Sequence, residues 1–148
     1  MGGLGIVRRG SVTRSQRGQS VVELAIALPV LLLTALGTVD MGRAFFTYIT
    51  LRNAASEAAL YGARNLAVSA ATMQGRALNE YLPAPYRAGT TATAQRTGNC
   101  TAVGGIGLMS VGLSRQFSPI SLDVLDFVGP GGTWEFTISP AAEARCMT

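Results

Sequence analysis

The chain has 148 residues, enough for one domain of modest core, and all 12 of its basic residues are arginine. Because it has no histidine and no lysine, it lacks Ser-His, Cys-His and Ser-Lys pairs, Schiff-base lysines and a P-loop lysine. Four arginines (Arg8, Arg9, Arg14, Arg17) precede Gly18 without an acid, whereas the eight that follow are balanced by eight acids. The excess charge thus indicates orientation in a membrane, not a nucleic-acid interface. We predict a non-enzymatic protein without a cofactor.

A basic leader, residues 1–18, comes before a run of 16 uncharged residues, 24–39. As a helix this run spans ~24 Å, and extending it back to residue 19 makes it long enough for a ~30 Å hydrocarbon core. We therefore predict a transmembrane helix over residues 19–43, with the leader in the cytoplasm and the rest of the chain outside it. A cleaved secretory signal peptide is the alternative, but the run is longer than a usual h-region and no small-x-small site follows it.

Two residues inside this segment are unusual for a plain membrane anchor. Glu23 is an ionisable group, which costs roughly 2.5–3.5 kcal/mol at the bilayer centre and less near the edge, so we expect it to have a partner charge. Pro29 removes one backbone hydrogen bond and is expected to kink or locally melt the helix. At the end of the segment, Asp40 and Arg43 are spaced to pair on one helix face.

Residues 44–85 are predicted to form an amphipathic helix. Apolar or small residues at three- to four-residue spacing form one stripe: Ala44, Tyr48, Leu51, Ala55, Ala58, Gly62 and Leu66. This stripe packs on the chain's own head, against helices of neighbouring subunits, or on both, since small residues let helices approach closely. Instead of one continuous helix, a second helical piece over residues 73–82, capped by Ser69 or Thr72, is also compatible with the sequence.

Residues 86–148 are predicted to form a small head that contains strands. The elements expected in it are strands over residues 90–97, 107–117 and 133–139, turns at 98–99 and 129–132, and a short helix over 119–127 that Ser118 caps. The fold class is therefore α+β, with a long N-terminal helix, first transmembrane and then amphipathic, that carries a small C-terminal head.

The two cysteines, Cys100 and Cys146, both lie in the predicted extracytoplasmic part, where disulfides persist. We predict one bridge, which stabilises the head by roughly 4 kcal/mol on chain-entropy grounds; two buried free thiols are the alternative. No metal site is expected from two cysteines without histidine, and Asp123 and Asp126 are interpreted as a solvated helix face. The glycine clusters GGIG and GPGG lack the context of nucleotide-binding loops and are interpreted as turns.

The segment from Gly18 to Glu23 resembles the processing motif of type IV prepilins, in which a glycine precedes the scissile bond and a glutamate follows five residues later. Residues 17–68 as a whole are similar to the TadE-like family, minor pilins or pseudopilins of the tight-adherence (Flp/Tad) system. The residues that carry this resemblance are Glu23, Pro29 with its leucine run, Gly37, Asp40, Gly42-Arg43 and the segment AASEAALYGAR. Flp-type pilins usually carry an aromatic residue after the glutamate, where this chain has Leu24.

The resemblance implies a pilin-like fold and a structural subunit that helps to initiate, cap or assemble a tight-adherence pilus. It implies cleavage between Gly18 and Gln19 by a prepilin peptidase, after which Glu23 pairs with the new terminal ammonium of its own chain or of a neighbour. The implied partners are other pilin or pseudopilin subunits, the assembly platform and the inner membrane, with no nucleic acid; a place in a surface pilus is a further expectation. The alternative is a signal-anchored envelope protein whose head binds a ligand and never enters a filament.

Overall fold

The computed structural model describes residues 16–100, 105–126, 132 and 134–147. The predicted leader up to residue 15 and residues 129–131 of the predicted turn lie outside this part of the chain. The chain divides into two compact units, Met1–Ala35 and Leu36–Thr148. The elements, in order, are α1 (Gln16–Arg64), α2 (Ala70–Arg76), η1 (Ala77–Tyr81), α3 (Ala84–Arg87), β1 (Thr90–Gly98), β2 (Ile106–Phe117), α4 (Ile120–Asp126), β3 (Phe136–Ile138) and β4 (Ala141–Met147).

The first unit contains the N-terminal part of α1, a helix of 49 residues that is assigned without a break through Pro29. The helix is therefore not melted at Pro29, because a proline removes one backbone hydrogen bond while those of the adjacent turns remain. The alternative expectation, a kink at Pro29, stays a prediction. Most large apolar side chains here are exposed, from 47% for Leu28 to 69% for Ile26, and Leu33 is half-buried. The part of α1 from Gly18 onward is long and apolar enough to cross a membrane, as the sequence predicted.

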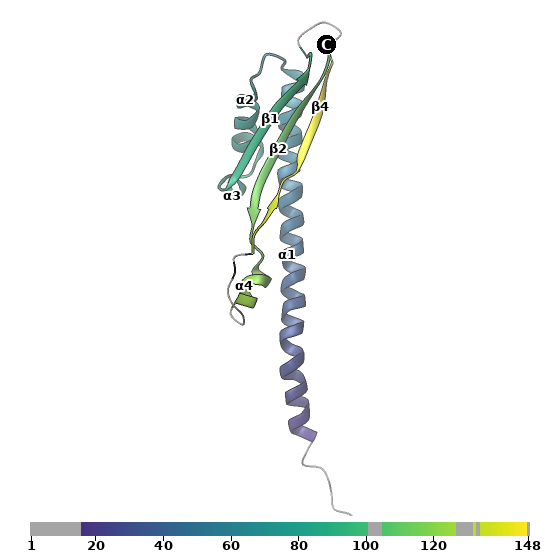
Figure 1. Ribbon diagram of the computed structural model, residues 1–148, viewed down its shortest axis with the longest axis vertical. Helices are drawn as coiled ribbons and strands as arrows, with labels where there is room; N and C mark the ends of the chain where they lie inside the picture. Colours follow the sequence, from purple (N-terminus) through teal and green to yellow (C-terminus); the bar gives the residue numbers. More distant parts are fainter. Residues whose placement is uncertain (1–15, 101–104, 127–131, 133, 148) are drawn as a thin grey trace, which may run out of the picture. The chain divides into compact units, whose positions relative to one another are not determined.

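The second unit contains the rest of α1 and a four-stranded antiparallel sheet. The central strand is β2, which pairs along one edge with β1 and along the other with β4 and then β3. Figure 1 shows β1, β2 and β4 side by side along the C-terminal part of α1, with α2 near β1. The structure thus confirms the predicted α+β fold: a long, apolar N-terminal helix followed by a small antiparallel head.

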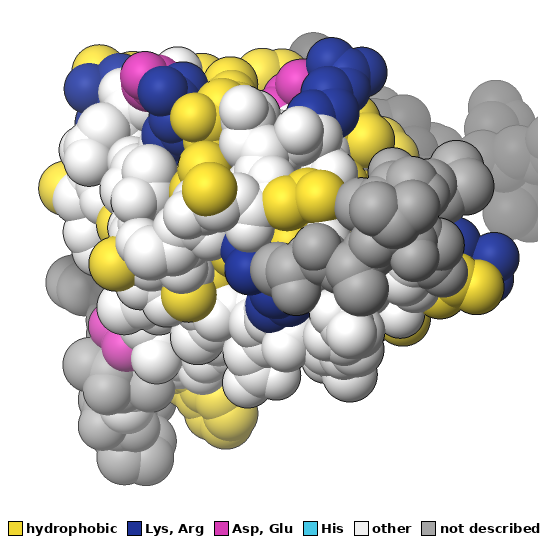
Figure 2. Space-filling view, turned by 90° about the horizontal axis from the view of Figure 1, so that it is seen from above, with side chains coloured by type: hydrophobic (Ala, Val, Ile, Leu, Met, Phe, Trp, Pro, Cys, Tyr) yellow, Lys and Arg dark blue, Asp and Glu magenta, His cyan; other side chains and the backbone are white. Residues whose placement is uncertain are grey.

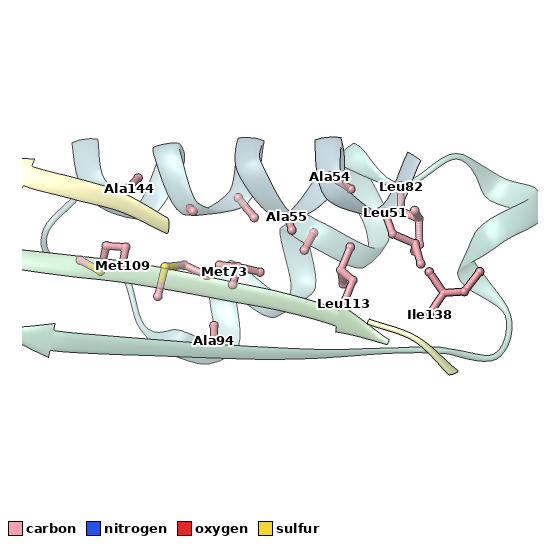
Figure 3. Packing of buried hydrophobic residues seen from close by; sticks show 14 of the residues in the cluster. Leu51, Ala54, Ala55, Met73, Leu82, Ala94, Met109, Leu113, Ile138 and Ala144 are labelled. Atoms are coloured by element: carbon pink, nitrogen blue, oxygen red, sulfur yellow. The ribbon is translucent and has the colours of Figure 1, made fainter. Parts of the chain in front are cut away.

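The core of this unit lies between α1 and the sheet (Figure 3). From α1 it takes Leu51, Ala54, Ala55, Ala58 and Ala59, and from β2 it takes Met109, Val111 and Leu113, all nearly inaccessible to solvent. The small alanines let the helix backbone approach the sheet closely. Of the predicted stripe, Leu51, Ala55, Ala58 and Gly62 are buried, Ala44 and Leu66 are half-buried, and Tyr48 is exposed. The stripe therefore packs on the chain's own head, as the first interpretation predicted.

The helical segment after α1 is divided into pieces. α1 ends at Arg64, and the Ser69 hydroxyl caps α2 by accepting a hydrogen bond from the Thr72 amide at 3.2 Å. A π-helical turn, η1, and the four-residue α3 follow it. The chain thus forms a separate second helix that Ser69 caps, rather than one continuous helix, as one of the two alternatives predicted. Helix α3 was not predicted.

Strands β1 and β2 and helix α4 occur where the sequence predicted a strand, a strand and a helix. The strand predicted over residues 133–139 was too long, because β3 pairs with β2 only from Phe136 to Ile138. Strand β4, with the sequence AAEARCM, was not predicted. Alanine and glutamate are poor strand formers, so β4 depends on its pairing with β2 and on burial of Ala144 and Cys146 rather than on its own propensity.

Cys100 and Cys146 form a disulfide with a Cα–Cα distance of 5.8 Å, the pairing that the sequence predicted. The bridge joins the chain just after β1 to the end of β4. Two glycines make this corner possible. Gly98 has φ of +87°, which side chains disfavour, and a Cβ at Gly107 would lie 2.8 Å from the Thr97 carbonyl oxygen. The corner between β1, β2 and β4 is therefore fixed by backbone geometry as well as by the covalent bond.

Candidate functional site

The residues of the predicted processing site lie in the first two turns of α1. Gly18, Gln19 and Glu23 are all exposed and, with Val22 and Ile26, line one shallow depression on the helix surface. Gln19 and Glu23 are four residues apart, so they share a helix face. A Cβ added at Gly18 would meet no atom within 4 Å, so packing within the described chain does not require glycine at this position.

Glu23 has apolar neighbours along a part of α1 on which no other described element packs. Val22, Leu24 and Ile26 are 59–69% exposed. Within the part of the chain that the structure describes, Glu23 forms no ion pair. The carboxylate and its apolar neighbours therefore offer a partner both a charge and a hydrophobic surface.

Asp40 forms a second polar site, in the second unit. Its carboxylate accepts a hydrogen bond from Arg43 at 2.9 Å through one oxygen and from the Ser121 amide at 2.7 Å through the other. The predicted Asp40–Arg43 pair is thus present, but Asp40 is buried rather than exposed. Since Ser121 is in the first turn of α4, the carboxylate satisfies an amide that has no partner within that helix. Asp40, and not the predicted Ser118, accepts the hydrogen bond of this amide.

Asp40 follows the uncharged run that ends at Val39, and its hydrogen bond with the Ser121 amide joins α1 to α4.

Next to Asp40 the second unit has a cavity of about 500 Å³ that is open on one side. Three elements and the residue after β2 line it: Val39, Gly42, Arg43, Phe46 and Thr47 of α1, Tyr86 of α3, Arg115, Gln116 and Phe117 of β2, and Ser118. Two arginines from distant parts of the sequence thus face one space. The sequence contained no signal for this arrangement, because Arg115 is 72 positions from Arg43 and belongs to no motif.

No group of three or more histidine, cysteine, aspartate or glutamate side chains in the described part of the chain could hold a metal ion. Figure 2 shows the end of the molecule that is uppermost in Figure 1, where acidic side chains lie beside basic ones along the rim. Basic and acidic side chains are therefore interspersed on this face.

Residues 18–60 match a protein-family model described as TadE-like protein. The match begins at Gly18, includes Glu23, Pro29 and Asp40, and ends within the part of α1 that packs on the sheet. No curated protein and no solved structure matches the chain. The predicted resemblance is therefore confirmed for α1, while the sheet and its surroundings have no counterpart in these comparisons.

Proposed function

Proceeding from a TadE-like segment over residues 18–60, we propose that the protein is a non-enzymatic, minor pilin-like subunit of a tight-adherence pilus. In this proposal it helps to initiate, cap or assemble the filament. It is anchored in the inner membrane by the N-terminal part of α1, with the leader in the cytoplasm and the head outside. The observation that carries the proposal is the family match, which covers both the apolar run and the part of α1 under the sheet.

The structure of α1 supports this role. The part of α1 in the first unit exposes an apolar surface. The small-residue face of α1 in the second unit packs against the chain's own sheet. Subunits could therefore pack through the first part of the helix but not through the alanine stripe. The partners we propose are other pilin or pseudopilin subunits and the assembly platform.

Glu23 gains a defined role if a prepilin peptidase cleaves after Gly18. The mature chain then begins at Gln19 with a positively charged ammonium, one helical turn from the Glu23 carboxylate. In a membrane this pair lowers the cost of both charges, and breaking such a buried pair costs roughly 3–5 kcal/mol. A pairing between the ammonium of one subunit and Glu23 of the next would fix the register of packed helices.

N-terminal sequencing of the protein extracted from membranes tests this proposal. We expect a mature chain that begins at Gln19, and loss of this product in Gly18→Leu because a side chain crowds the scissile bond. Gly37→Leu is the matched control, since Gly37 lies in the same helix and also has no atom within 4 Å of an added Cβ. An intact leader on protein from cells with an active pilus system would refute processing and favour an anchored envelope protein with a ligand-binding head.

A further inference from the structure

The cavity beside Asp40 contains a positive charge that no described acid compensates. Arg115 is half-buried, and its guanidinium donates to the Tyr86 and Ala88 carbonyl oxygens, both at 2.7 Å, and to the Thr90 hydroxyl at 3.4 Å. These acceptors are neutral, and among the described residues Arg115 forms no ion pair. Removing a charge from water is costly unless an opposite charge accompanies it. Arg115 is thus held in place by the fold while its charge is left for an external anion.

A second guanidinium lines the same cavity. Arg43 is paired with Asp40 through one nitrogen, and its side chain remains 45% exposed. The Asp40 carboxylate is shared with the Ser121 amide, so it does not neutralise both arginines. The aromatic rings lie close to the two guanidinium groups, with Phe117 5.2 Å from Arg43 and Tyr86 5.7 Å from Arg115. Two oriented guanidinium groups are well suited to bind the oxygens of a phosphate group.

The cavity lies at the end of the uncharged run of α1, which indicates a phosphate group that belongs to the membrane. Val39, the last residue of the uncharged run, is in the cavity wall together with Arg43. At 1.5 Å per residue, Arg43 lies ~6 Å beyond Val39 along the helix. The polar headgroup layer on each side of a bilayer is roughly 5–7 Å thick, so Arg43 reaches the level of the phosphates. Tyrosine side chains such as Tyr86 are also typical of this interfacial layer.

We propose that the cavity between α1, α3 and the end of β2 binds the phosphodiester headgroup of an anionic phospholipid. Arg115 and Arg43 contact the phosphate oxygens. Gln116 and Ser118 offer hydrogen bonds to the rest of the headgroup. Val39 and Phe46 contact the glycerol and the adjoining acyl parts of the lipid. The proposal requires that α1 is a membrane anchor, but it does not depend on a role in a pilus. Its failure can therefore be distinguished from failure of the proposed function.

The full chain, reconstituted in nanodiscs that contain phosphatidylcholine and phosphatidylglycerol, tests the proposal. After extraction in mild detergent, the lipids that remain bound are quantified by mass spectrometry. We expect phosphatidylglycerol to be enriched above its share of the nanodisc in the wild type, and this enrichment to be lost in Arg115→Gln. Arg52→Gln, which removes an exposed arginine of α1 outside the cavity, should retain it. Equal loss in both variants, or no enrichment in the wild type, would overturn the proposal.

A second variant tests the same cavity in case Arg115→Gln does not fold. Gly42 is in the cavity wall, and a Cβ added there would meet no atom within 4 Å. Gly42→Leu should therefore occupy part of the cavity while every arginine contact remains. We expect loss of lipid enrichment with an unchanged disulfide and unfolding midpoint, and full enrichment in this variant would contradict the proposal.

Two further arms identify other sources of the anion. Inorganic phosphate added to the detergent-extracted protein should not displace bound phosphatidylglycerol, since it lacks the glycerol and acyl parts that contact Val39 and Phe46. Displacement by phosphate at low concentration would overturn the lipid assignment in favour of a free-phosphate site. Unchanged lipid retention in Arg115→Gln together with lost co-purification of pilus components would overturn it in favour of an acidic protein partner.

Discussion

The two parts of α1 belong to one helix but have opposite surroundings. Up to residue 35, the large apolar side chains are mostly exposed on all sides of the helix. From Leu36 onward, the helix has one buried face, made mainly of alanines with Leu51, and an exposed face that mixes charged residues with large apolar ones such as Phe45. The two parts of the helix therefore differ in cover: the chain's own sheet buries one face of the second part and none of the first.

This difference shows which part of α1 is stabilised by contacts within a single chain. The second part is covered by the chain's own sheet, so its burial contributes to folding of the monomer. The first part has no cover within the described chain, so a membrane or another subunit must supply it. Changes in the first part should affect insertion and assembly, whereas changes in the second part should affect stability of the head.

The largest expected effect comes from Glu23→Ala in the first part. The variant should insert into the membrane slightly better, because the cost of burying a charge is removed, and it should still be cleaved. Its co-purification with pilus components should be lost, and Glu23→Gln should fail similarly since it keeps shape but not charge. Glu57→Ala, which removes an exposed acid from the second part of α1, is the control. Normal co-purification of Glu23→Ala would exclude the assembly role.

In the second part, Cys146→Ser should have the largest effect on stability. Opening a loop with a sequence separation of 46 should cost roughly 4 kcal/mol in the chain-entropy treatment. The unfolding midpoint of the full chain in detergent measures this, and Cys100→Ser should give the same loss. If both thiols titrate in the denatured, non-reduced protein, the bridge does not exist in solution.

Leu51→Ala and Phe45→Ala compare the buried and the exposed face of the same helical region. Leu51 is fully buried against the sheet, so its truncation should lower the free energy of unfolding by about 2–5 kcal/mol. Phe45 is 64% exposed, and its truncation should change that energy by less than about 0.5 kcal/mol. Denaturant titration measures both, and similar losses would show that the exposed face is also packed in the monomer.

The smallest effect concerns the hydrogen bond between Asp40 and the Ser121 amide. Asp40→Asn replaces the charged carboxylate with a neutral amide, so it should weaken this charge-assisted hydrogen bond. Hydrogen-exchange protection of the Ser121 amide should therefore be lower in Asp40→Asn than in the wild type. Equal protection in the two proteins would show that Asp40 does not hold α4 in place.

The parts of the fold that follow from local sequence were predictable. The apolar run, the stripe around Ala55, the Ser69 cap and the extents of β1 and β2 all depend on residues close together in the chain. Strand β4 was not, since its sequence favours no strand and it is formed by pairing with β2 and by burial of Cys146. The shortened β3 has the opposite cause: its alternating pattern extends further than its pairing partner does.

The candidate sites divide along the same line. Glu23 was found because a charge inside an apolar run is visible in the sequence. The spacing of Asp40 and Arg43 indicated their ion pair, but not the burial of Asp40, which depends on Ser121, 81 positions later. Arg115 was missed entirely, because only the folded chain brings it to the same space as Arg43.

The disulfide between Cys100 and Cys146 also sets an order of events during biosynthesis. In the proposed orientation the head crosses the membrane in chain order, so β1 and β2 can form their hairpin before β4 arrives. During this interval Cys100 has no partner in its own chain, and the edge of β2 that β4 will occupy is open. Two nascent chains that meet at this stage could join through their Cys100 thiols. Correct maturation therefore depends on oxidation being slower than translocation of the last strand, or on a thiol-disulfide exchange catalyst that reverses the error.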